Sequence, residues 1–357
     1  MNHGLYIHIP FCSQKCPYCN FYSTVGLSYQ DEYLDALLTE AGSLAGTRFD
    51  TIYVGGGTPT FLGVKLTGFL EKIASLTSYS GVEFTVEANP ESVSVELIKG
   101  LAAIPVSRIS MGAQSMNNSA LKLLGRIHSV KQTLKAYDIV RENSKCSINL
   151  DMMYDIPSVD AKVTENSLKR LIALQPEHIS AYSYSAETGY LTDKSAEDPY
   201  QTEMAAELLE SAGYKRYEVS NYAIPGHESI HNTKYWDMSH YYGIGAGAHS
   251  MISCNGKRTR YCHQTDIEKY IKNPLGRDNV EIYDEDKSVI ESVLFGLRRL
   301  EGIDLIEISE KFGTIPDRVV GKINFLADEG LLRCVGNRVK ASPEGLLLLD
   351  SVMSYLL

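Results

Sequence analysis

Residues 5–225 alternate between two hydrophobic patterns. Short runs rich in apolar and β-branched residues predict six strands, at Leu5–Ile9, Thr51–Val54, Glu83–Glu87, Arg108–Met111, Cys146–Asp151 and His178–Tyr184. The segments that follow them have apolar residues at helical spacing, which predicts helices at Tyr29–Leu44, Val64–Thr77, Val95–Ala102, Ser119–Leu124, Val130–Asn143, Val163–Leu174 and Gln201–Ala212. Six strand-then-helix units predict a parallel sheet with helices outside it. Short right-handed connections between the strands curl such a sheet toward a barrel. The expected fold is therefore α/β, a partial (β/α)6 TIM-like barrel with an edge strand at Arg216–Tyr222; a doubly wound open sheet is the alternative.

The pattern changes from about Asp284 onwards. The predicted helices and hairpin strands are Ser288–Leu300, Leu305–Phe312, Asp317–Asp328, Leu331–Val335, Arg338–Lys340 and a last helix from Pro343. Three helices and a hairpin are typical of a winged-helix-like unit. Acidic and basic residues are mixed here, which favours a packing or partner module over a DNA-binding one. We therefore expect a barrel at 1–225, a connecting segment at 226–283 and a small C-terminal domain at 284–357.

Composition narrows the class of protein. Hydrophobic residues make up 44% and charged residues 22% of the 357 residues, which is ordinary for a soluble globular protein. The net charge of -10 and the lack of a basic stretch argue against a nucleic-acid partner. No apolar run approaches the ~18 residues needed to span a bilayer, and a strand-like segment follows Met1 too closely for a signal peptide. We expect a cytoplasmic protein whose seven cysteines are reduced.

Three of those cysteines lie on one short loop with the spacing C-x3-C-x2-C, namely Cys12, Cys16 and Cys19. Three thiolates can hold three irons of a cubane cluster and leave the fourth iron open to a ligand. A structural zinc site, which wants four ligands, and a redox pair of Cys16 and Cys19 are less favoured alternatives. The other cysteines are expected to be buried apolar thiols: Cys146, Cys254, Cys262 and Cys334.

Glycines and polar residues gather where the predicted strands end. The run Gly55-Gly56-Gly57-Thr58-Pro59 follows the second strand, and its glycines let the backbone approach a ligand closely, although a tight turn would use them as well. Because loops after parallel barrel strands converge on one face, this run is expected near the cysteine loop. The other polar residues of this rim are Glu87, Gln114, Arg126 and Asp151. Together they predict a site for a charged small molecule with a carboxylate, an amine and hydroxyls.

The cysteine loop, the preceding run Tyr6–Phe11 and the Gly-Gly-Gly-Thr-Pro run resemble the radical S-adenosylmethionine (SAM) superfamily. The resemblance is closest to the branch of the oxygen-independent coproporphyrinogen III oxidases and covers nearly the whole chain, including Leu124–His128 and Ser342–Leu346. It implies that Cys12, Cys16 and Cys19 ligate a [4Fe–4S] cluster. It also implies that SAM chelates the open iron and contacts Tyr6, Tyr18, Gly56, Gly57, Thr58, Glu87, Gln114, Arg126 and Asp151.

Two departures from the oxidase pattern separate the subfamilies. The oxidases carry a fourth cysteine two residues after the third, where this chain has Phe21. They also carry an N-terminal extension, which is expected to be absent here because the chain begins five residues before Tyr6. Both features are shared by the heme chaperones of the same branch.

A third feature is the run His231-Asn232-Thr233-Lys234-Tyr235-Trp236, which resembles an H-N-x-x-Y-W motif of those chaperones. Histidine is the commonest axial ligand of heme iron, and the two aromatic residues offer faces for stacking on a porphyrin. The run follows Pro225-Gly226 and is expected on a loop that can open, with His231 as the heme ligand and His249 as a weaker candidate. The alternative is that the histidine and the aromatic pair pack beneath the barrel.

The main interpretation is a heme chaperone that binds a [4Fe–4S] cluster, SAM and heme, and delivers heme to acceptor hemoproteins, some of them membrane-associated. The alternative is an oxygen-independent coproporphyrinogen III oxidase, in which a radical made from SAM starts the oxidative decarboxylation of propionates. A zinc-bearing structural barrel is the third interpretation. The sequence leaves open whether SAM is cleaved.

Overall fold

The computed structural model of the protein describes residues 3–184, 199–254 and 257–357. Six parallel strands form its centre. They are β1 (His3–Ile9), β4 (Arg48–Gly56), β5 (Ser78–Ala88), β6 (Arg108–Gln114), β7 (Ser147–Tyr154) and β8 (His178–Ser183). Their apolar residues are buried in near-continuous runs, as expected where a parallel sheet is covered on both faces. The predicted α/β fold with six strand-then-helix units is confirmed.

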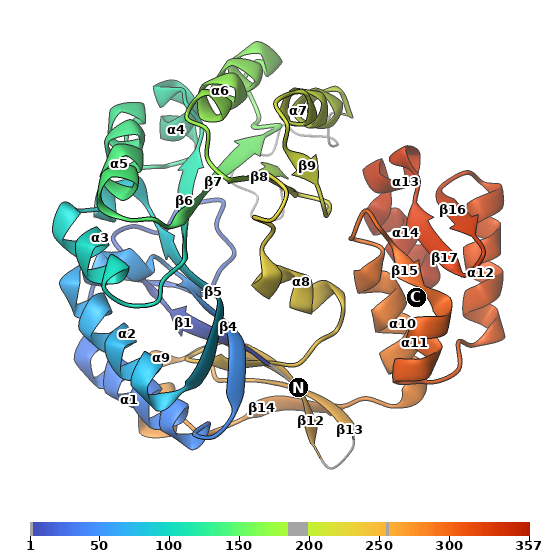
Figure 1. Cartoon of the computed structure of the whole chain (residues 1–357), viewed down its shortest axis with the longest axis horizontal. Coiled ribbons are helices and arrows are strands. Elements are labelled where there is room, and N and C mark those ends of the chain that lie inside the picture. The colour runs from blue at the N-terminus through green and yellow to red at the C-terminus, as the bar shows by residue number, and fades with distance from the viewer. Residues whose placement is uncertain (1–2, 185–198, 255–256) are drawn as a thin grey trace.

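Helices cover the outer face of this curved sheet (Figure 1). They are α1 (Gln30–Ser43), α2 (Val64–Leu76), α3 (Val95–Ala102), α4 (Asn118–Leu123), α5 (Val130–Asn143), α6 (Ala161–Ala173), α7 (Pro199–Ser211) and, beside α1, α9 (Ile267–Lys272). The Ser129 side chain and Gln132 form a capping box at the start of α5, which explains why this helix begins where the sequence pattern predicts.

Further strands extend the sheet beyond both ends of the six. They are β9 (Lys215–Arg216), β10 (Asn221–Ala223), β11 (Tyr241–Ile244), β12 (His249–Cys254), β13 (Lys257–Cys262) and β14 (Asp278–Ile282). The sheet order is β14-β13-β12-β11-β1-β4-β5-β6-β7-β8-β10-β9, and β11 pairs with β1 in parallel. Segment 226–283 therefore adds four strands to the sheet, besides connecting the barrel to the C-terminal domain.

The single edge strand predicted at Arg216–Tyr222 is wrong in detail. The structure has two short antiparallel strands there, β9 and β10. The residues between them leave the sheet because their backbone pairs with the C-terminal domain: Val219 N donates to Arg298 O at 3.1 Å, and Leu300 N donates to Tyr217 O at 3.1 Å.

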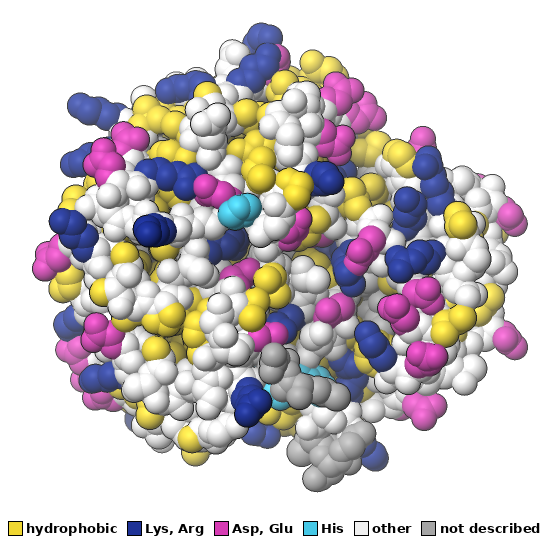
Figure 2. All heavy atoms as spheres, viewed as in Figure 1, with side chains coloured by type: hydrophobic (Ala, Val, Ile, Leu, Met, Phe, Trp, Pro, Cys, Tyr) yellow, Lys and Arg dark blue, Asp and Glu magenta, His cyan; other side chains and the backbone are white. Residues whose placement is uncertain are grey.

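The C-terminal domain has its own apolar core and a winged-helix-like set of elements. They are α10 (Glu285–Gly296), β15 (Ile303–Asp304), α11 (Leu305–Phe312), α12 (Asp317–Asp328), β16 (Leu332–Val335), β17 (Arg338–Ala341), α13 (Pro343–Leu347) and α14 (Leu349–Leu356). Figure 2 shows its lysines and arginines interspersed with aspartates and glutamates on the face in view. In the described part of the chain, none of the helices has the length and apolar character that a membrane span needs.

Candidate functional site

The cysteine loop is fastened to the glycine run through backbone hydrogen bonds. Gly57 N donates to Ile9 O at 2.8 Å and Thr58 N donates to Phe11 O at 2.8 Å, so the pairing of β1 with β4 continues into the loop. A further parallel pair, β2 (Phe11–Cys12) with β3 (Thr24–Val25), closes the loop behind Cys19. The glycine run therefore lies directly against the cysteine loop, at the carboxyl ends of the strands.

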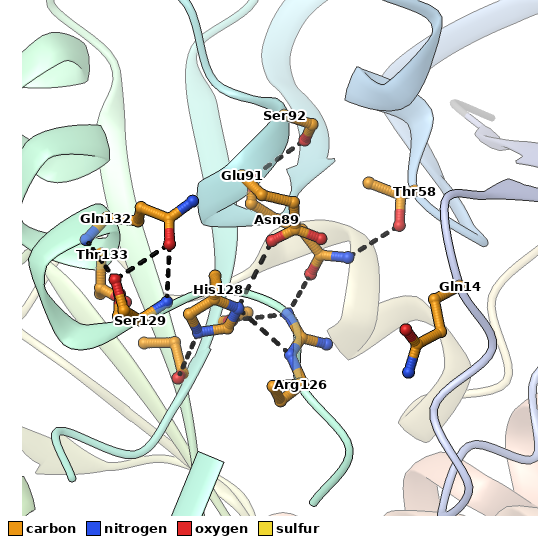
Figure 3. A network of polar contacts seen from close by, with 12 residues as sticks. Gln14, Thr58, Asn89, Glu91, Ser92, Arg126, His128, Ser129, Gln132 and Thr133 are labelled. Carbon is orange, nitrogen blue, oxygen red and sulfur yellow. Dashed lines mark hydrogen bonds and ion pairs between the residues drawn. The ribbon is translucent and has the colours of Figure 1, made fainter. Parts of the chain in front are cut away.

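A chain of polar contacts links two of the cysteines from behind. Cys12 Sγ lies 3.6 Å from Thr58 Oγ1, and Asn89 Nδ2 donates to the same hydroxyl at 2.8 Å. Arg126 then donates through Nη2 to Asn89 Oδ1 at 2.6 Å and through Nη1 to Cys16 Sγ at 3.7 Å. Figure 3 shows Asn89 between Thr58 and Arg126. These polar contacts fix the positions of the Cys12 and Cys16 thiols and of the Arg126 guanidinium relative to one another.

The surroundings of Arg126 keep it charged. Burial alone would lower the pKa of Arg126, but Tyr18, Cys16 and Glu91 outweigh it, so the pKa is raised. Such a fixed cation beside the cysteine loop stabilises bound thiolates and can hold an anionic group of a ligand.

The three thiols fit a cubane cluster better than a single metal ion. All three are free and half-buried, and burial raises the pKa of Cys12 and of Cys19. In residues 3–184, 199–254 and 257–357, no three side chains of histidine, cysteine, aspartate or glutamate converge on one metal ion. A cubane does not require such convergence, since each thiolate binds a separate iron. Soft thiolates on one exposed loop are the donor set that iron–sulfur clusters use.

Gly57 is a position in this arrangement where the cysteine loop leaves no room for a side chain. A Cβ atom there would lie 2.8 Å from Phe11 O and 3.0 Å from Cys12 Sγ. We expect Gly57→Ala to push the cysteine loop outward, lowering the free energy of unfolding of the metal-free protein by roughly 1–3 kcal/mol and weakening cluster retention. Urea unfolding and iron content measure both effects.

Gly68→Ala is the matched control. Gly68 lies exposed within α2, and a Cβ atom there would meet nothing within 4 Å. This variant should keep its iron and gain up to about 1 kcal/mol. Equal behaviour of the two variants would show that the close approach of Gly57 to the loop is unimportant.

Four of the residues implied in SAM binding line one cavity of about 290 Å³, which extends from the cysteine loop into the barrel. They are Tyr18, Glu87, Gln114 and Asp151. Gln114 adopts a left-handed backbone with φ of 61°, which is uncommon for a non-glycine residue. The remaining cavity wall includes Phe21, Tyr53, Arg108, Ser110, Asn149, Met153, Ser180, Tyr182 and Asn232.

The other implied residues lie behind the cavity wall. Gly56 is one of them, and a Cβ atom there would lie 2.7 Å from the ring of His8. The Tyr6 hydroxyl lies 3.0 Å from His8 Nδ1, and the Tyr6 ring stacks on Tyr53 with centroids 6.2 Å apart. Gly57, Thr58 and Arg126 face the cysteine loop, as described above. The residues implied by the resemblance thus form one continuous region without all reaching the same cavity.

Glu87 is the titratable group best placed to sense a cationic ligand. It accepts hydrogen bonds from Tyr53 Oη at 2.8 Å and from Gly56 N at 3.2 Å. Burial, with a contribution from the Asp151 charge, raises the pKa of Glu87 to about 7. Its charge therefore appears as the pH rises through neutrality.

Because SAM is a cation, we expect its affinity to rise about tenfold between pH 6 and pH 8 as Glu87 ionises. Titration calorimetry of SAM across this range measures the effect. Glu87→Gln should bind SAM weakly and with a flatter pH profile. Glu96→Gln, which removes an exposed carboxylate from α3, should keep the wild-type profile. An unchanged profile in Glu87→Gln would contradict the assignment.

His231 is a buried residue of a short helix, α8 (Ile230–Trp236), within the curve of the sheet (Figure 1). The prediction that this segment is a loop is wrong. The Glu83 carboxylate caps the helix by accepting from Ile230 N at 2.7 Å, and Lys234 Nζ pairs with Asp50 Oδ2 at 2.9 Å. These partners on β4 and β5 are distant in sequence, which is why the local pattern resembles a loop.

Both ring nitrogens of His231 have partners. Nδ1 lies 2.9 Å from Thr51 Oγ1, and Nε2 lies 2.9 Å from Tyr235 Oη. The side chain is 0% exposed, and burial lowers the pKa of His231 to about 3. Trp236 instead packs against the C-terminal domain, with Arg298 4.6 Å above its ring. In this conformation His231 packs against Thr51 and Tyr235 inside the barrel, whereas Trp236 does not, and the imidazole is neutral.

Several residues of the site were not identified from the sequence. Asn89, which links Thr58 to Arg126, directly follows β5, and its place at a strand end was the available signal. Asn149 accepts from His178 Nδ1 at 2.6 Å and donates to Asp151 Oδ1 at 2.6 Å. Arg108 begins β6 and faces the same interior.

The remaining predictions have mixed outcomes. Cys146 and Cys262 are buried as expected, whereas Cys334 is exposed because it lies on the outer β16–β17 hairpin. The side chain of Cys254 lies outside the described residues. His249, the weaker heme-ligand candidate, is exposed at the start of β12.

The fold and the three-cysteine loop define a radical SAM protein. Residues 6–165 match the radical SAM superfamily, and residues 284–348 match the HemN C-terminal domain. This class implies a [4Fe–4S] cluster and SAM as cofactors.

Within this class, the chain belongs to the family of the heme chaperone HemW. It is 33% identical to the heme chaperone HemW of Lactococcus lactis, covering 99% of this chain and 96% of the relative. It is 31% identical to that of Escherichia coli K12, covering 99% and 98%. The structure of the coproporphyrinogen III oxidase HemN from Escherichia coli matches with a TM-score of 0.84 at 23% identity, covering 99% of this chain and 90% of that one, which shows a shared fold.

Proposed function

We propose that this protein is a cytoplasmic heme chaperone that binds a [4Fe–4S] cluster, SAM and heme, and passes heme to acceptor hemoproteins, including membrane-associated ones. The observation that carries the proposal is the similarity to heme chaperones along the whole chain, at 31–33% identity. Phe21 supports it, because an exposed aromatic residue lies at the cavity rim where the related oxidases carry a further cysteine.

In this proposal the cysteine loop binds the cluster and the cavity binds SAM. Cys12, Cys16 and Cys19 ligate the cluster, which supplies an open iron and an electron when bound. Arg126 and Asn89 fix the thiols relative to Thr58 through the contacts described above. Glu87 and Asp151 receive the cationic and hydroxyl groups of SAM, and Tyr18 and Gln114 close the cavity around it.

Heme binds through His231 in this proposal. Its neutral imidazole has a lone pair for iron without loss of a proton. His231 would hold the iron through Nε2, which now contacts Tyr235 Oη, so α8 would have to move for heme to enter. The helix has seven residues, and such a movement would exchange the Glu83 cap, the Lys234–Asp50 ion pair and the packing of Trp236.

A turnover assay separates this proposal from the coproporphyrinogen III oxidase alternative. The anaerobically reconstituted protein is given coproporphyrinogen III, SAM and a strong reductant, with a coproporphyrinogen III oxidase as the positive control. We expect no protoporphyrinogen IX above background from this chain. Several turnovers per chain would overturn the proposal in favour of the oxidase.

A further inference from the structure

Arg108 is a buried cation, and two of its three guanidinium nitrogens have no partner among the described residues. Its side chain lies at the start of β6 and the residue is 4% exposed. In the described part of the chain, its Nε and Nη1 atoms are buried and have no hydrogen-bond acceptor. Leaving a guanidinium buried and unpaired is unfavourable, so an anionic group of a ligand would stabilise it.

The carboxyl groups near Arg108 do not bond to its Nε and Nη1 atoms. Glu87 and Asp151 line the same cavity. Burial raises the pKa of each of these two carboxyl groups, and the Arg108 charge acts in the opposite direction on both. Their bonds are directed elsewhere, to Tyr53 and to Asn149.

The nearby histidine, His178, carries no negative charge and does not accept a hydrogen bond from Arg108. His178 is bonded on both sides, to Asn149 Oδ1 at 2.6 Å and to Tyr217 Oη at 2.9 Å. Burial, reinforced by the Arg108 charge, lowers the pKa of His178 well below its ordinary value, so the ring is neutral. Arg108 is therefore the cation that an anion entering this end of the cavity would meet.

The position of Arg108 separates it from the cluster end of the cavity. Arg108 and Gln114 are the first and last residues of β6, which places them about 20 Å apart along the strand. Gln114 lies at the rim with the cysteine loop, where the amino-acid end of SAM would reach the open iron. The cavity that Arg108 lines also has the polar side chains of Ser110, Asn149, Ser180 and Asn232, together with the carboxyl groups of Glu87 and Asp151. Asn232 is the neighbour of His231 on α8.

We propose that Arg108 binds a carboxylate of the ligand that enters the inner end of the cavity, and that in the heme-loaded protein this group is a porphyrin propionate. This inference rests on the proposed function and adds to it the recognition of the porphyrin side chain. Arg108, rather than an aromatic surface alone, then selects porphyrins that carry free carboxylates, and Asn232 places this contact beside the proposed iron ligand.

The test compares heme with heme dimethyl ester, which has the same ring and iron but no free carboxylate. Absorbance titrations of the reconstituted wild-type protein should give at least about tenfold tighter binding of heme than of the ester. Arg108→Gln should lose this preference by weakening heme and leaving the ester unchanged. Arg108→Lys should recover part of it, whereas Arg48→Gln, at an exposed position on β4, should behave as wild type.

A SAM titration of the same variants identifies the source of the carboxylate. If Arg108→Gln weakens SAM and leaves the heme-to-ester ratio intact, the carboxylate is that of SAM and the propionate assignment is overturned. If neither changes, Arg108 binds no carboxylate. Equal binding of heme and ester by the wild-type protein overturns the inference even if the variants fail to fold. Failure of the wild-type protein to bind either porphyrin would instead overturn the proposed function.

Discussion

Cys16→Ala is expected to reduce the iron and sulfide content from about four of each per chain to background after anaerobic reconstitution. Cys16 supplies one of three thiolates, and its Sγ atom is also the end of the Arg126 contact that fixes the loop. Two thiolates cannot retain a cubane against exchange. The broad absorbance of the cluster near 400 nm should disappear with the iron.

Cys334→Ala is the control for this loss. Cys334 is also a free and accessible thiol, but it lies on the C-terminal hairpin far from the loop in the fold. Its removal should leave iron and sulfide at the wild-type level. Tight binding of zinc with no iron in the wild-type protein would contradict the cluster and favour a structural metal site.

His231→Ala is expected to weaken heme binding more than about 100-fold. This is more than the loss expected when a residue that only hydrogen-bonds to a metal ligand is removed. The iron of the cluster and the affinity for SAM should remain. The substitution also removes a fully buried ring and leaves the Thr51 and Tyr235 hydroxyls without their partner. We therefore expect the free energy of unfolding to fall by about 2–4 kcal/mol as well.

Tyr235→Phe separates ligation from packing. This variant loses one of the same hydrogen bonds, at a cost of about 1 kcal/mol, but keeps the imidazole and frees Nε2. Its heme affinity should equal or exceed that of wild type. If Tyr235→Phe and His231→Ala lose heme to the same degree, the residues act through packing alone, and the heme ligand lies elsewhere.

The sequence pattern predicted best those elements that are stabilised by residues close to them in the sequence. Helices α5, α11 and α12 begin and end where their apolar spacing indicates, and side-chain caps fix the starts of α5 and α11. The strands were predicted less accurately at their ends. β6 continues to Gln114 and β5 begins at Ser78 because pairing with neighbouring strands, rather than an apolar run, decides where a strand ends.

The parts of the site that depend on distant partners could not be predicted. Helix α8 is seven residues long, and Glu83 and Asp50, which hold it, lie more than 140 residues earlier. Arg108 and Asn149 resemble ordinary strand residues until the sheet curves and brings them to one interior. The cysteine loop was predictable because three thiolates at fixed spacing carry their chemistry in a short run of sequence.

The most direct test of the central claim is a heme titration of the anaerobically reconstituted wild-type protein, followed by absorbance. We expect a Soret band that saturates at one heme per chain and that is lost in His231→Ala while the cluster remains. Absence of saturable binding, or equal binding by the wild-type protein and His231→Ala, would contradict the proposal that heme binds at His231.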